Sequence, residues 1–165
     1  TLVEASCGPK PGSLTLHINS NNPTLTTAST DFVLAADGAG GWEGQVWDRQ
    51  VDVAVTTLDA LIAVHGAPAF VKIDVEGYEA NVLDGLSQPP PALSFEFTTI
   101  QRDVALACLD RIATLGDYRF SLSLGEFLSF ERSGCTLDAM RRHIAELPHE
   151  ANSGDVYAVR EAALA

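Results

Sequence analysis

The spacing of apolar residues along the chain distinguishes the segments expected to form strands from those expected to form helices. Apolar and polar residues alternate in Leu14–Ile18 and in Val51–Val55, which is typical of strands with one buried face. Phe70–Val75 and Ala92–Phe97 are almost continuously apolar, which predicts strands that are buried on both faces. Shorter apolar runs predict the remaining strands, at Thr1–Cys7, Tyr118–Leu124 and Val156–Val159, with Phe127–Phe130 as a candidate for one more.

Helices are expected where apolar residues recur every three or four positions. In the segment Val104–Leu115 they share one face of such a helix, and Leu137–Leu147 is also expected to be helical. Thr57 is a good N-cap for a short helix over Leu58–Val64. A further helix is expected after Gly77, with its apolar face formed by Val82, Leu83 and Leu86.

The order of these elements predicts the fold class. Between residues 51 and 124 strands and helices alternate, which favours an α/β domain with a mostly parallel sheet and helices on its faces. We expect strands 51–56, 70–75 and 92–97 in that sheet, with the last two adjacent because a short right-handed crossover joins them. No linker divides the chain, so residues 1–165 are expected to form one domain.

Composition excludes several classes of protein. The net charge is −12 and the ten basic residues are scattered, which argues against a nucleic-acid partner. No apolar run reaches the length of about 18 residues expected of a membrane span. Three widely spaced cysteines predict reduced thiols and a cytoplasmic location, and the four histidines lack the spacing of a metal site, so no metal is expected.

Charged residues gather at the end of the strand 70–75. Lys72 and Asp74 are two positions apart and therefore share a face, and Asp74 lies at the carboxyl end, where open α/β sheets bind ligands. Glu76 follows in the turn, and Glu96 ends the next strand at the same edge. Glu79 lies in the first helical turn, where the helix dipole favours an anion.

Four motifs in this region resemble the FkbM methyltransferase family. They are Thr57-Leu58-Asp59-Ala60-Leu61, the strand-turn-helix segment from Phe70 to Glu79, Val82-Leu83-Asp84-Gly85, and Leu93-Ser94-Phe95-Glu96. They follow the family's "TLD-L", "IKIDVEGxE", "VLxG" and strand-ending "E" in order and at the family's spacing. The resemblance covers about residues 1 to 100.

The resemblance implies a Rossmann-like class I methyltransferase sheet and transfer of a methyl group from S-adenosylmethionine to a hydroxyl of a small molecule or sugar. A hydroxyl acceptor needs a proton acceptor nearby. Asp74 or Glu76 is the expected base, with Glu96 as the alternative, and Lys72 would hold Asp74 ionised or orient the acceptor. Asp74 is also the candidate for contact with the cofactor.

The family's glycine-rich cofactor loop and its ribose-binding carboxylate are not found in these residues, and Thr1–Cys7 resembles the strand that follows them. The sequence therefore predicts a partial domain, without its first strands, that binds S-adenosylmethionine weakly. A sheet exposed in this way could also pair with a second copy of the chain.

Other interpretations remain open at this stage. Gly38–Gly44 could be a nucleotide loop, although a surface loop fits better because the glycine spacing is one residue too long. Trp42 and Trp47 either line an acceptor pocket or pack that loop onto the domain. Lys72 and Asp74 could form a buried structural ion pair. The whole chain could be a non-catalytic remnant of the fold or a nucleotide-dependent oxidoreductase.

Overall fold

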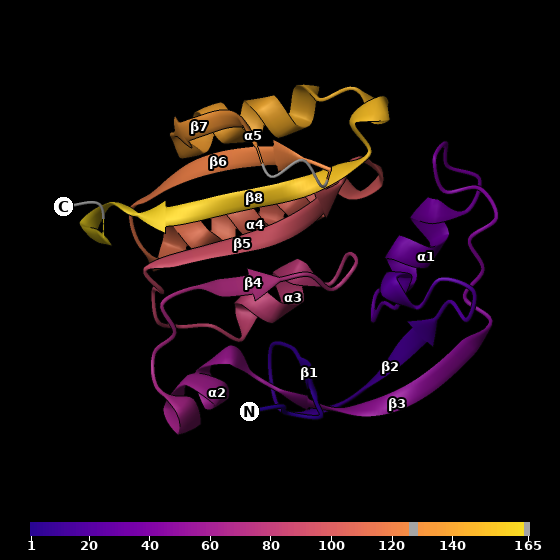
Figure 1. Ribbon diagram of the computed structural model, residues 1–165. Coiled ribbons are helices and arrows are strands. Elements are labelled where there is room, and N and C mark those ends of the chain that lie inside the picture. Colours follow the sequence, from indigo (N-terminus) through magenta and orange to yellow (C-terminus); the bar gives the residue numbers. More distant parts are fainter. Residues whose placement is uncertain (126–128, 164–165) are drawn as a thin grey trace.

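The computed structural model describes residues 1–125 and 129–163, which form two sheets and their helices (Figure 1). The smaller sheet has the order β1-β3-β2 and the larger the order β4-β5-β8-β6-β7. The strands are β1 (Ser6–Cys7), β2 (Gly12–Ile18), β3 (Arg49–Thr56), β4 (Val71–Ile73), β5 (Ala92–Thr98), β6 (Tyr118–Leu124), β7 (Phe130–Cys135) and β8 (Ser153–Arg160).

The four expected helices are present, together with one at Thr30–Ala36 that the sequence did not predict and short 3-10 turns. The α-helices are α1 (Thr30–Ala36), α2 (Leu58–His65), α3 (Glu79–Asp84), α4 (Arg102–Leu115) and α5 (Leu137–Glu146). The 3-10 turns are η1 (Pro23–Leu25), η2 (Thr99–Gln101), η3 (His149–Ala151) and η4 (Glu161–Ala163). Thr57 caps α2 as predicted, because its side chain accepts a hydrogen bond from the Ala60 amide.

The parallel pairing predicted for the two most apolar strands is confirmed. In β4 and β5, Val71 lies beside Leu93 and Ile73 lies beside Phe95. The helix α3 provides the crossover between them. Helices α3, α4 and α5 cover one face of this sheet, where Leu83, Phe95 and Leu109 are fully buried (Figure 1).

The prediction of a mostly parallel sheet is wrong, because the larger sheet is mixed. β8 runs antiparallel to both β5 and β6, and β6 pairs with β7 in a hairpin. A hairpin needs only a short turn, whereas a parallel neighbour needs a crossover long enough to return the chain to the same edge. The candidate strand Phe127–Phe130 falls mostly outside the described residues, since 126–128 are not described; β7 begins at Phe130.

The placement of strand 51–56 in the same sheet as β4 is also wrong. β3 belongs to the smaller sheet, where it pairs antiparallel with β2 and parallel with β1. The first half of β3 is exposed, and an exposed strand cannot occupy the buried interior of a parallel sheet. Of the strand expected at the N-terminus, only Ser6–Cys7 pairs with a neighbour.

The glycine-rich segment 38–44 follows helix α1 and leads to β3 without an intervening helix. It therefore lacks the strand-loop-helix arrangement that a nucleotide loop needs. Trp42 and Trp47 both pack edge-on against Phe32 of α1, at ring distances of 5.2 and 5.9 Å. These tryptophans hold the loop against the domain, as the simpler interpretation of the sequence proposed.

No helix in residues 1–125 and 129–163 is long and apolar enough to cross a membrane.

A candidate active site at the carboxyl ends of β4 and β5

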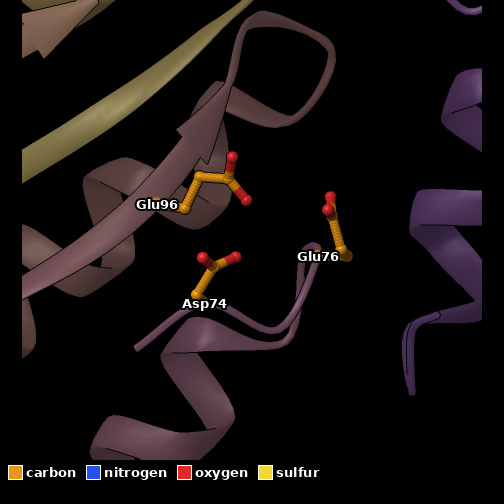
Figure 2. A group of neighbouring side chains, drawn as sticks. All are labelled: Asp74, Glu76 and Glu96. Carbon is orange, nitrogen blue, oxygen red and sulfur yellow. The ribbon is translucent and has the colours of Figure 1, made fainter. Parts of the chain in front are cut away.

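Three carboxylates from separate parts of the backbone meet at one edge of the larger sheet. Asp74 directly follows β4, Glu96 lies near the end of β5, and Glu76 lies in the turn before α3. Because β4 and β5 are parallel and Ile73 is beside Phe95, the next residue, Asp74, lies beside Glu96. One oxygen of each carboxylate lies within 4.8 Å of the others (Figure 2). We call Asp74, Glu76 and Glu96 the carboxylate cluster.

The turn that carries Glu76 has an unusual backbone conformation. Glu76 has a φ of 52° and Gly77 a φ of 87°, in the region that favours glycine. The Glu79 carboxylate accepts hydrogen bonds from the amides of Val75 and Gly77, at 3.2 and 3.1 Å. From the opposite direction, the Thr27 hydroxyl donates to the Glu76 carbonyl at 2.6 Å. These bonds fix Glu76 in a conformation that it would otherwise rarely adopt.

Lys72 connects the cluster to strand β8. Its ammonium group lies 3.3 Å from Asp74 and 2.7 Å from Asp155. The side chains of Lys72 and Asp74 are each 48% exposed, so the interpretation of a buried structural ion pair is wrong. The pKa of Lys72 is nevertheless raised: burial would lower it, but the hydrogen bond and charge of Asp155, followed by those of Asp74, outweigh burial.

Burial and mutual repulsion make the other two carboxylates weak acids. Burial raises the pKa of Glu76 to about 7, helped by the charges of Asp74 and Glu79. The pKa of Glu96 is raised to about 9, first by burial and then by the charges of Glu76 and Asp74. A hydrogen bond between Glu96 and Asp74, which requires a proton on one of them, acts in the same direction. With no cation bound beside it, Glu96 therefore favours its protonated form.

A small cavity lies against the cluster, and polar atoms without a partner face it. It has room for roughly one water molecule. Glu96, Gly77, Glu79 and Gln101 help to line it. Gln101 is only 7% exposed, and neither its Oε1 nor Oε2 of Glu96 has a hydrogen-bond partner among the residues that the structure describes. Buried polar atoms normally have partners, so these two point to a bound molecule or ion.

The structure brings together all four residues singled out from the sequence, Lys72, Asp74, Glu76 and Glu96. Sequence reasoning missed Thr27, Gln101 and Asp155. Asp155 lies opposite Glu96 in the antiparallel pair β5–β8, and only the fold places it there. For Gln101 there was a weak signal, because it follows directly after the ligand-binding end of β5.

Comparison with protein families gives a match. A family model described as the methyltransferase FkbM domain matches residues 1–121. The matched segment contains the carboxylate cluster, Lys72, Glu79, Thr27 and Gln101, while Asp155 lies beyond it. No sequence among curated proteins matches the chain.

Proposed function

Because this chain belongs to the FkbM methyltransferase family, we propose that it serves the transfer of a methyl group from S-adenosylmethionine to a hydroxyl oxygen of a small molecule or sugar. The observation that carries this proposal is the convergence of Asp74, Glu76 and Glu96 beside Lys72 at the ligand-binding edge of the sheet. Pairs of titratable groups in different protonation states are typical of acid–base sites.

Asp74 is the proton acceptor in this proposal. It is half exposed, so a substrate can reach it, and its salt bridge with Lys72 holds its carboxylate in place. A hydroxyl held within hydrogen-bonding distance would pass its proton to Asp74 as its oxygen attacks. The neutral Glu96 would donate its hydrogen bond to Asp74 before the reaction and keep that carboxylate aligned.

S-adenosylmethionine supplies an electrophilic methyl group on a positively charged sulfur. Asp74, at the ligand-binding edge of the sheet, is the residue that would contact the cofactor. Among the described residues no glycine-rich loop joins a strand to a helix N-terminus, so we expect residues 1–165 to bind the cofactor weakly.

The oxidoreductase interpretation loses its basis, because the matching family model is that of a methyltransferase and Gly38–Gly44 does not follow a strand. A non-catalytic remnant of the fold differs from our proposal in one measurable way. Its carboxylate cluster would not influence turnover, whereas the proposal requires Asp74 for proton transfer.

The test is an assay with methyl-labelled S-adenosylmethionine and a panel of hydroxylated sugars and small alcohols. Transfer to a hydroxyl gives an ether, whose label survives mild base, whereas a carboxyl acceptor gives a base-labile ester. We expect base-stable label, lost in Asp74→Asn and retained in Asp155→Asn, which changes the other carboxylate paired with Lys72. A base-labile product would overturn hydroxyl transfer, and equal turnover by both variants would overturn the role of Asp74.

A further inference from the structure

We propose that the carboxylate cluster, together with Gln101, is a binding site for one hard divalent cation of the Ca²⁺, Mn²⁺ or Mg²⁺ class. This inference goes beyond the proposed methyl transfer and contradicts the expectation from the sequence that no metal is bound. It starts from the convergence of Asp74, Glu76 and Glu96 on a single small space (Figure 2).

The ligand atoms are all oxygens. Ca²⁺ and Mg²⁺ prefer carboxylate and amide oxygens, and soft metals such as Zn²⁺ prefer sulfur and imidazole nitrogen. The cysteines of the described residues, Cys7, Cys108 and Cys135, are free thiols and do not belong to this group. The chemistry of the cluster therefore selects a hard cation.

The distances within the cluster are those of a coordination sphere. Two oxygens that bind one ion can be no farther apart than twice the metal–oxygen distance. This limit on the oxygen–oxygen distance is about 5 Å for Ca²⁺ and about 4.2 Å for Mg²⁺. The three oxygens lie within 4.8 Å of one another. This spacing is close to that of Ca²⁺ ligands, while Mg²⁺ requires the carboxylates to move farther inward or to bind through water.

The unpartnered amide of Gln101 is an observation independent of the acidic residues. Gln101 is 93% buried, and its Oε1 has no hydrogen-bond partner within residues 1–125 and 129–163. That oxygen lies so close to Gly77 that a Cβ there would be only 2.2 Å from it, and Gln101 lines the same cavity as Glu96. The amide oxygen therefore lies against the turn next to Glu76 and lines the same cavity as Glu96, and a cation bound there would give it a partner.

The lack of basic partners for two of the carboxylates also favours a cation. Among the residues the structure describes, Lys72 forms an ion pair with Asp74, while neither Glu76 nor Glu96 has one. Glu76 is only 8% exposed and is fixed in place through the Thr27 and Glu79 hydrogen bonds to its turn. A rigid carboxylate buried without a partner is costly, and a coordinated cation removes that cost.

The test is titration calorimetry of the metal-free protein with CaCl₂, MnCl₂ and MgCl₂ at constant ionic strength, supported by electron paramagnetic resonance of Mn²⁺. We expect one site per chain, which Glu96→Gln and Asp74→Asn weaken at least about tenfold and Gln101→Leu weakens by about 10–100-fold. Glu146→Gln, which changes an exposed acid of α5, is the matched control and should bind normally.

Circular dichroism establishes that each variant is folded before its binding is measured. Absence of heat and of a change in the Mn²⁺ spectrum at 10-fold molar excess with about 1 mM protein would overturn the proposal. So would binding that Asp74→Asn, Glu96→Gln and Glu146→Gln share, because it would come from the acidic surface at large. These outcomes do not depend on methyl transfer, so the two proposals succeed or fail separately.

Discussion

The buried carboxylate of Glu79 lies beneath the turn that carries Glu76 and accepts hydrogen bonds from the amides on either side of it. Two carboxylates three residues apart therefore have different tasks. Glu79 is 2% exposed and holds the backbone, and its pKa is raised by burial although these hydrogen bonds lower it. Glu76 contributes to the carboxylate cluster. The position of Glu79 in the first turn of α3 had suggested only a contribution to the helix start.

We predict that Glu79→Ala lowers the free energy of unfolding by about 2–4 kcal/mol, because it leaves two backbone amides without an acceptor. Glu79→Gln keeps an acceptor oxygen and should cost less. Urea denaturation monitored by circular dichroism measures both values. If Glu79→Ala unfolds at the same urea concentration as the wild type, the hydrogen bonds do not support the turn.

Asp74→Asn should lower the methyl-transfer rate by about 10²–10⁴-fold, the usual contribution of a general base. The variant should remain folded, since Asp74 is half exposed and its loss strands no buried charge. Initial rates with saturating cofactor give the change. If Asp74→Asn retains near-normal turnover while Glu96→Gln loses it, the general base is Glu96 on β5 rather than Asp74.

Glu96→Gln should change how stability depends on pH. The pKa of Glu96 is raised from 4.5 to about 9 in the folded protein, so folding takes up a proton at pH values between these two. The resulting stabilisation is complete below about pH 4.5 and is lost as the pH rises through about 9.

The wild-type protein should therefore lose stability between pH 5 and 9 more steeply than Glu96→Gln, which lacks this titration. Thermal denaturation in a buffer with chelator measures both curves. Parallel curves would show that Glu96 titrates normally. The pKa of Glu76 is raised to about 7, so its titration should add a smaller loss of stability with rising pH. That loss should be the same in the wild type and in Glu96→Gln.

Gly77→Ala should destabilise the fold strongly. A Cβ there would lie 2.2 Å from Gln101 Oε1 and 2.9 Å from Phe32, and the φ of 87° disfavours any side chain. Gly38→Ala is the matched control, because Gly38 has a similar φ of 74° and open space around it. We expect a loss of about 1 kcal/mol in the control and clearly more in Gly77→Ala, measured by urea denaturation. Equal losses would mean that Gln101 and Phe32 move aside easily.

Two of the cysteines, Cys108 and Cys7, should react with a thiol reagent at different rates. Cys108 is fully buried on α4, and burial raises its pKa far above the usual range, so it should react only after unfolding. Cys7 is partly buried with a raised pKa and should react slowly in the native protein. Mass spectrometry after timed labelling identifies each site, and rapid native labelling of Cys108 would contradict the packing of α4 against the sheet.

Local pattern was sufficient to predict most elements and the family. The apolar runs in 70–75 and 92–97 and the crossover between them predicted a parallel pair, which the structure contains as β4 and β5. The FkbM resemblance of residues 57–96 predicted the family, which the match over residues 1–121 confirms. Since residues two apart on a strand share a face, the contact of Lys72 with Asp74 also followed from the sequence.

Tertiary structure decided which neighbours those residues have. The apolar run Val156–Val159 did not indicate the direction of β8. The antiparallel pairing of β8 with β5 nevertheless brings Asp155 to Lys72. Thr27 reaches the Glu76 carbonyl across 49 positions, and no periodicity relates the two residues. Spacing along the chain determines which side chains share a strand face or a helix face, because backbone geometry repeats locally. Contacts between distant segments depend on how whole elements pack, and the burial that makes Glu76 and Glu96 weak acids arises only there.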